Sequence, residues 1–145
     1  MGNKYTIYTD GGARGNPGPG AAGIVIEGSD IGKKEFGEFL GPVTNNDAEY
    51  KAVILALKKL KHLIGSEKAS KAEVQVYVDS ELLERQVNGQ YKIKESNLQK
   101  LFMDLWNARL DFGKVVISHV RREGNRRADE IVNEVLDREE SRLDL

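Results

Sequence analysis

Four acidic residues stand at positions where their carboxylates could act together in catalysis. Asp10 ends one predicted strand and Asp79 ends another, each directly before a turn or a helix start. Groups at the carboxyl ends of parallel strands converge on the crevice where ligands bind, so these two carboxylates would meet if their strands are neighbours. A single aspartate at a strand end is more simply explained as a turn residue. The two aspartates therefore indicate a catalytic site only together with further acids.

The other two acids lie on predicted helices. Glu49 lies on the same helical stripe as Val53 and Leu60, so it points toward the sheet. A carboxylate on an apolar face is costly unless it is paired or binds a metal. Asp129 borders the apolar stripe of the last predicted helix. Taken alone, it could equally be a first-turn acid favoured by the helix dipole.

Together the four acids indicate a divalent metal site. Hard cations such as Mg²⁺ prefer oxygen ligands, and three or four carboxylates could hold two ions about 3.5–4 Å apart. Such ions activate water on one side of a phosphate and neutralise the leaving oxygen on the other. The chain has no cysteine, and its two histidines lack zinc-ligand spacing. The pattern therefore predicts phosphodiester hydrolysis with Mg²⁺, or with Mn²⁺ as an alternative ion.

The elements that must position these acids begin with three strands. Residues 4–10, 21–27 and 33–40 each read as a strand, and the first two contain many β-branched residues. Residues 11–20, with five glycines and two prolines, read as a wide turn. Short connections between successive strands favour an antiparallel meander.

From Thr44 onward, apolar residues recur at helical spacing and predict a helix from residue 46 to about 62. Asp79 follows an alternating strand over residues 73–78, and Ser80 is a candidate N-cap for the helix behind it. The remaining predicted elements are a polar linker over 65–71, a helix over about 96–110, a short buried strand over 114–118 and a helix over about 125–140.

This order of elements predicts a mixed α/β fold. A meander followed by helix-separated strands implies a mixed sheet covered by helices, since strands joined through a helix usually pair in parallel with a right-handed crossover. The chain has 145 residues and shows no internal repeat or domain-breaking linker. We therefore expect a single domain over residues 1–145.

Composition excludes several classes of protein. Charged residues make up 31% of the chain, and no apolar run approaches the ~18 residues of a spanning helix. The first residues lack the basic and apolar regions of a secretion signal. Without cysteine, disulfide scaffolds and thiol nucleophiles are excluded. The net charge of −1 means that nucleic-acid binding would need a local patch. We expect a soluble, cytoplasmic monomer with no membrane partner and no small-molecule cofactor.

Other short motifs are weaker. Gly18–Gly23 matches G-x-G-x-x-G, but β-forming residues follow it, whereas the dinucleotide fingerprint needs a helix there. Residues 28–34 lack the spacing and the Ser or Thr of a phosphate loop. An aspartyl-phosphate phosphatase would need a second aspartate two residues after Asp10, where Gly12 stands.

Four blocks of sequence resemble, in order, the motifs of type 1 ribonuclease H. The resemblance extends from about residue 4 to 137 and implies a five-stranded mixed sheet with three antiparallel strands and helices on both faces. It also implies endonucleolytic cleavage of the RNA strand of an RNA–DNA hybrid, leaving 3′-hydroxyl and 5′-phosphate ends. The blocks are Tyr8–Gly12 with Gly15–Gly18, Thr44–Glu49, Tyr77–Ser80, and His119 with Asn125 and Ala128–Asp129.

The same resemblance implies catalytic roles. Asp10 would bridge two Mg²⁺ ions. Glu49 and Asp79 would complete the ligands of the ion beside the leaving oxygen. Asp129 would complete the ligands of the ion that activates water. His119 would lie on a mobile loop near the scissile phosphate and assist proton transfer or product release. Without the resemblance, a lone histidine after a strand is more often a surface or capping residue.

Substrate contacts are implied as well. A hybrid differs from DNA in its 2′-hydroxyl groups, which small amide side chains and backbone groups can contact in a wide minor groove. As plain sequence features, the asparagines could equally be turn residues, and Asn45 or Asn46 could be helix caps. The implied substrate-binding residues are Gly11, Asn16, Asn45 and Asn46, with Thr44 and Asn97 at a pocket for a DNA-strand phosphate.

The chain departs from the family pattern at two places. Pro42 replaces an arginine often found two positions before Thr44, which weakens the expected phosphate pocket. Only residues 90–96 separate Gly89 from Asn97, so the basic helical protrusion of many relatives is missing. We therefore expect weaker hybrid binding, because phosphate contacts dominate affinity. Its salt dependence would rest on Arg85, Lys92, Lys94 and the lysines of the first helix.

Two alternative functions share the predicted architecture. The first is a non-catalytic binding module, although the presence of all four acids gives no reason to regard the site as inactive. The second is an exonuclease, resolvase or transposase core, which normally needs extra domains or a different final block.

Overall fold

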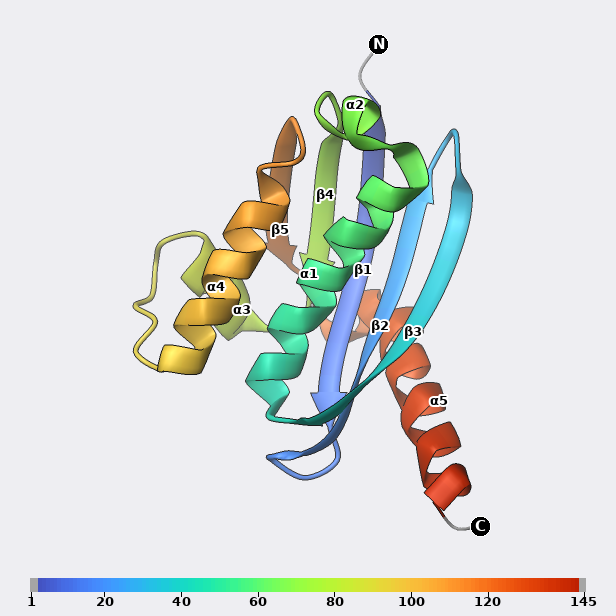
Figure 1. The fold of residues 1–145 in the computed structure, drawn as a ribbon, viewed down its shortest axis with the longest axis vertical. Helices are drawn as coiled ribbons and strands as arrows, with labels where there is room; N and C mark the ends of the chain where they lie inside the picture. Colours follow the sequence, from blue (N-terminus) through green and yellow to red (C-terminus); the bar gives the residue numbers. More distant parts are fainter. Residues whose placement is uncertain (1–2, 144–145) are drawn as a thin grey trace.

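The computed structural model describes residues 3–143 and has a five-stranded sheet in the order β3-β2-β1-β4-β5 (Figure 1). The first three strands pair antiparallel, and β1 pairs with β4 and β4 with β5 in parallel. The predicted mixed sheet with an antiparallel meander is therefore confirmed. The strands are β1 (Lys4–Ala13), β2 (Gly18–Gly28), β3 (Gly32–Val43), β4 (Glu73–Val78) and β5 (Lys114–His119).

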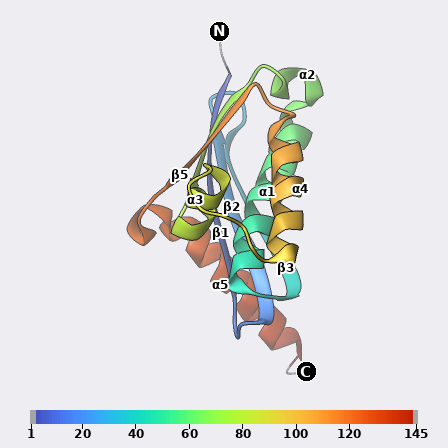
Figure 2. The same ribbon diagram turned by 90° about the vertical axis from the view of Figure 1, so that its left-hand side faces the viewer.

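Helices cover both faces of this sheet, as predicted. The main core lies between the sheet and α1, α3 and α4, and a smaller core lies between β2 and α5 on the other face. Figure 2 views the sheet nearly edge-on, with α1 and α4 side by side along one face. The helices are α1 (Asn45–Ile64), α2 (Ser66–Ala69), α3 (Glu81–Val87), α4 (Ser96–Arg109) and α5 (Arg126–Leu143), with the 3₁₀ turn η1 (Arg122–Asn125) before α5.

A capping box fixes the start of α1. The Thr44 hydroxyl accepts a hydrogen bond from the Asp47 backbone N–H at 3.1 Å, and the Asp47 carboxylate accepts one from the Thr44 N–H at 3.4 Å. The cap is thus Thr44, not Asn45 or Asn46, and the helix begins one residue earlier than predicted. Its buried face, which includes Val53 and Leu60, packs on the sheet.

The glycine-rich segment after Asp10 is mostly strand, which corrects the predicted wide turn. β1 continues to Ala13 and β2 begins at Gly18, with Gly12 opposite Ala21. Asp10 therefore lies within β1 and not at its end. Parallel pairing with β4 nevertheless stops at Thr9, so Asp10 is the first residue of β1 beyond that ladder.

Two further differences from the predicted elements are local. The segment over 65–71 contains the four-residue helix α2, which is too short and too polar to show a helical stripe. Gly18–Gly23 lies in β2, so no helix N-terminus follows it, and the dinucleotide fingerprint is absent there. Within residues 3–143, no helix combines the length and apolar character needed to cross a membrane.

Candidate active site

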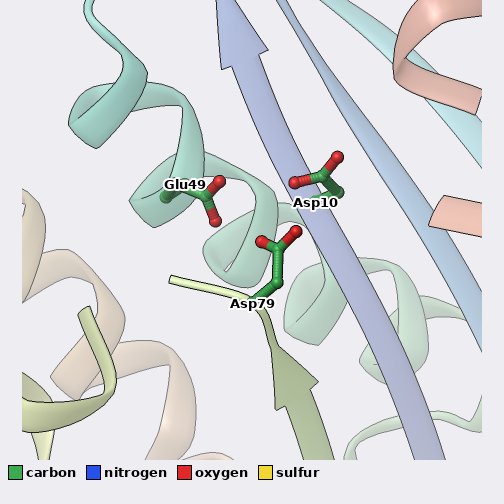
Figure 3. Close-up of side chains that lie close together, drawn as sticks. All are labelled: Asp10, Glu49 and Asp79. Carbon is green, nitrogen blue, oxygen red and sulfur yellow. The ribbon is translucent and has the colours of Figure 1, made fainter. Parts of the chain in front are cut away.

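Three of the four predicted acids meet where the parallel strands β1 and β4 stop pairing. Asp10 lies in β1, one residue beyond its pairing with β4, and Asp79 directly follows β4. Glu49 reaches both from the first turns of α1 (Figure 3). One carboxylate oxygen from each of these residues lies within 4.8 Å of the others. Elements distant in sequence thus bring three carboxyl groups to one point.

Two glycines allow the helices that carry site acids to approach the sheet closely. A Cβ atom on Gly11 would lie 2.2 Å from the Ala48 carbonyl oxygen in α1, next to Glu49. A Cβ atom on Gly23, which pairs with Asp10 across β1 and β2, would lie 2.1 Å from the Ala128 carbonyl oxygen in α5. Any side chain at either position would push a helix, and with it an acid, away from the sheet.

We expect Gly11→Ala to lower the free energy of unfolding by about 2–3 kcal/mol, because the added methyl group meets rigid backbone. The neighbouring variant Gly12→Ala is a matched control, since its Cβ would lie 3.6 Å from Val132 Cγ1 at ordinary contact distance. Urea unfolding of both variants measures the difference. Equal stability of the two variants would contradict the close approach of α1.

Burial and mutual repulsion raise the pKa values of the clustered acids. The pKa of Asp10 rises from 3.8 to about 8, through desolvation first and then through the charges of Asp79 and Asp129. The pKa of Glu49 also rises well above its usual value, for the same first cause and because Asp10 and Asp79 are near. Asp10 therefore keeps its proton up to about pH 8, and full ionisation of the cluster calls for a positive charge among these oxygens.

The fourth acid, Asp129, lines the same pocket from the first turn of α5. Its proximity contributes to the raised pKa of Asp10, but it lies outside the group of three mutually close oxygens. The pocket has a volume of about 690 Å³ and also contains His119. All four predicted acids thus face one cavity, with three of them in direct proximity.

The donor set fits a hard divalent cation. Glu49 Oε2 is buried and has no hydrogen-bond partner, which is unusual for a carboxylate oxygen. Asp10 is only 6% exposed. A buried, unpartnered oxygen beside two further carboxylates is what a metal ion with oxygen ligands would satisfy.

His119 is the last residue of β5 and is exposed at the rim of the pocket. Parallel pairing places it opposite Val78, one residue before Asp79. The segment from Val120 to Glu123, which follows it, lines the same pocket. His119 thus approaches the acids from the strand next to β4.

The predicted substrate residues divide into two groups. Gly11, Asn45 and Asn46 line the pocket, whereas Asn16, Thr44 and Asn97 lie outside its lining. Several of these side chains also hold the local structure. Asn16 Oδ1 accepts from the Asn45 N–H, and Asn45 Oδ1 accepts from the Ala13 N–H, both at 3.0 Å. These two bonds join the β1–β2 turn to the start of α1.

Asn97 and Thr44, predicted at a phosphate pocket, are joined through one acid. Asn97 Nδ2 donates to Asp47 Oδ1 at 2.6 Å, and the same carboxylate caps α1 with Thr44. A phosphate binding there would meet the negative charge of Asp47. Together with Pro42, this arrangement favours a weak phosphate pocket.

Three cations of the predicted basic patch are engaged in ion pairs. Lys59 pairs with Glu38 at 3.6 Å, and Lys61 with Asp111 at 3.3 Å. Arg85 pairs with Glu81 at 2.7 Å and also lies over the ring of Tyr91. These cations are partly neutralised before any substrate arrives.

Three arginines around the pocket were missed by sequence reasoning. Arg14 lines it from the β1–β2 turn, and Arg121 and Arg122 from the segment after β5. Their closeness in sequence to the motifs was an available signal, because each arginine stands within four residues of Asp10 or His119. Lone arginines are so common on surfaces that proximity in sequence did not single them out.

The sequence is similar to known proteins over most of its length. The family model for RNase H matches residues 2–137. A ribonuclease HI of Halobacterium salinarum is 36% identical over 94% of this chain, and a ribonuclease H of Rickettsia massiliae is 32% identical over 90% of both sequences. The chain spans about two thirds (66%) of the Halobacterium protein and 36% of a bifunctional protein of Mycobacterium tuberculosis.

Solved structures show the same fold. LC11-RNase H1, crystallised in complex with an RNA/DNA hybrid, superposes with a TM-score of 0.84 at 43% identity and covers 92% of this chain and 97% of its own. RNase H1 from Halobacterium salinarum superposes with a TM-score of 0.83 at 35% identity and covers 92% of this chain and 98% of its own. The similarity therefore includes nearly every element described above.

Proposed function

Because this chain belongs to the RNase H family, we propose that it is a metal-dependent endoribonuclease that hydrolyses the RNA strand of RNA–DNA hybrids. The observation that carries the proposal is the cluster of Asp10, Glu49 and Asp79, whose oxygens lie within 4.8 Å of one another. A similar solved protein, LC11-RNase H1, binds an RNA/DNA hybrid, which supports the substrate class.

We assign Asp10, Glu49, Asp79 and Asp129 as the ligands of two Mg²⁺ ions, with Mn²⁺ as an alternative. Bound there, such ions activate water and stabilise the negative charge that develops on a phosphate and its leaving oxygen. Asp10 is the acid that interacts with all the others, because its pKa responds to Asp79 and Asp129 and that of Glu49 responds to Asp10. This central position suits a shared ligand. Attack by water on the phosphorus would break the P–O3′ bond, and protonation of the departing oxygen would leave 3′-hydroxyl and 5′-phosphate ends.

The remaining pocket residues bind and orient the substrate. The Gly11 backbone and the Asn45 and Asn46 side chains line the cavity, where they can reach 2′-hydroxyl groups of the RNA strand. Asn16 supports this surface by fixing Asn45 through its backbone N–H. Thr44 and Asn97 complete the interface as a weak contact for a DNA-strand phosphate.

His119 is assigned to proton transfer or product release. It is exposed at the pocket rim and no hydrogen bond to its ring is formed within the described residues, so the imidazole is available to a substrate. We expect His119→Ala to lower kcat about 10²-fold while KM changes little, since general acid–base groups act on the reaction and not on binding. Steady-state kinetics on a labelled hybrid measures both constants. A main effect on KM would instead make His119 a binding residue.

Gel analysis of end-labelled substrates tests the proposed function. The hybrid should be cut within its RNA strand in Mg²⁺ and left intact with a chelator. DNA duplex and single strands serve as comparison substrates. Cleavage that is confined to strand ends would favour the exonuclease alternative, and binding without cleavage in either metal would favour the non-catalytic module.

A further inference from the structure

Arg14 joins the β1–β2 turn to the second half of α5 across the rim of the pocket. Its Nη1 donates to Glu140 Oε1 at 2.7 Å, and its Nη2 donates to Asp137 Oδ1 at 2.8 Å and to Asn133 Oδ1 at 3.3 Å. The Arg14 N–H donates to the Pro19 carbonyl at 2.9 Å, so the base of the side chain is held within the turn. Two carboxylates thus share one guanidinium.

The partners of Arg14 continue a stripe that begins at the catalytic acids. Asp129, Asn133, Asp137 and Glu140 follow one another at intervals of three or four residues, which places them on one side of α5. Asn133 Nδ2 also donates to the Asp129 carbonyl at 3.2 Å. Eight residues of helix separate Asp129 from Asp137, a span of about 12 Å. Arg14 therefore lies a short distance from the acids, along the wall of the same cavity.

The ion pairs of Arg14 are of the kind that a phosphate can replace. The side chains of Asp137 and Glu140 are 68% and 61% exposed, whereas that of Arg14 is 35% exposed. Carboxylates so open to water return to full hydration at little cost, because exposed ion pairs contribute little stability. Here the two N–H groups of the guanidinium bond two separate carboxylates, whereas a single phosphate can accept both as two parallel hydrogen bonds.

We propose that Arg14 is a binding residue for a backbone phosphate of the hybrid, and that Asp137 and Glu140 compete with that phosphate for its guanidinium. The phosphate would lie roughly 12 Å from the scissile one, which is the span between Asp129 and Asp137 along α5. This inference rests on the proposed function, since it takes the hybrid as substrate. It gives the acidic end of α5 a role in weakening substrate affinity.

Fluorescence anisotropy with a labelled hybrid in EDTA, at several salt concentrations, tests the competition. We expect the double variant Asp137→Asn/Glu140→Gln to bind about three- to tenfold more tightly than the wild type. Its slope of log K against log[salt] should be steeper by about 0.9, which corresponds to one more phosphate contact. Adding Arg14→Ala to this double variant should remove both changes, whereas Arg14→Lys should keep part of the gain.

A second arginine cluster on α5 provides the matched control. Arg127 pairs with Glu134 at 3.1 Å and with Glu130 at 3.3 Å, and it also binds Glu35, but it does not line the catalytic pocket. Glu130→Gln/Glu134→Gln changes the net charge by the same amount on the same helix. An equal gain in affinity from both double variants, or a gain that survives Arg14→Ala, would overturn the inference.

The outcomes separate this inference from the proposed function. If the wild type cleaves the hybrid but the gain in affinity does not depend on Arg14, only the role of Arg14 is contradicted. Failure of every variant to bind or cleave the hybrid contradicts both.

Discussion

Asp10→Asn is expected to reduce hybrid cleavage about 10²- to 10³-fold, the scale on which enzymes lose rate when a group that stabilises transition-state charge is removed. Asparagine keeps the size of the side chain but supplies one neutral oxygen where the carboxylate supplied two charged ones. Because Asp10 lies at the centre of the acidic cluster, its loss should weaken every metal position at once. Initial rates on a labelled hybrid in Mg²⁺ measure the effect.

The same substitution should leave the fold intact, which distinguishes a chemical from a structural loss. Asp104→Asn is a matched control, because Asp104 is exposed on α4, outside the pocket lining, and loses the same charge. Both variants should give the far-UV spectrum of the wild type, and Asp104→Asn should keep its activity. If Asp10→Asn retained activity within tenfold of the wild type, the assignment of Asp10 as a metal ligand would be wrong.

The second large effect is a loss of stability with rising pH in the absence of metal. In the folded protein the pKa of Asp10 is about 8, whereas in the unfolded chain it returns to about 3.8. Between these values the folded state holds a proton that the unfolded state has released, so the free energy of unfolding falls as pH rises. This contribution is fully present below pH ~4 and is lost by about pH 8. The raised pKa of Glu49 acts in the same direction.

Thermal unfolding in EDTA from pH 5 to 8.5 measures this dependence. One pKa unit corresponds to about 1.4 kcal/mol, so we expect the Asp10-dependent part of the loss to reach about 2 kcal/mol or more, or several degrees in Tm. Mg²⁺ should reverse the loss at pH 8, because it binds only the folded, ionised cluster. Asp10→Asn should flatten the EDTA profile and raise Tm at pH 8. A profile that is the same in wild type and variant would show that the carboxylates do not repel one another.

The sequence was sufficient for the mixed sheet with its antiparallel meander and for the direction of Glu49. The helical stripe that holds Glu49 beside Val53 and Leu60 correctly predicted that its carboxylate faces the sheet, where it lies with those of Asp10 and Asp79. The helix between the meander and the strand before Asp79 correctly implied parallel strands, and β1 and β4 are neighbours. These features follow from hydrophobic periodicity and chain connectivity, which are properties of the sequence.

Details that depend on long-range pairing were not predictable in the same way. Glycines and prolines after Asp10 indicated a turn, yet antiparallel pairing with β2 extends β1 to Ala13. Asn45 and Asn46 were candidate caps, but the N-cap of α1 is Thr44, which forms a capping box with Asp47. The contacts of Arg14 with Asp137 and Glu140 span more than 120 residues, and no local pattern indicates them.

The most direct test of the central claim is an anomalous difference map from crystals soaked in Mn²⁺, first alone and then with bound hybrid. The claim predicts ion density bounded by the carboxylate oxygens of Asp10, Glu49 and Asp79, with a second ion toward Asp129 once the hybrid is present. Density elsewhere, with none among these oxygens in either crystal, would contradict it.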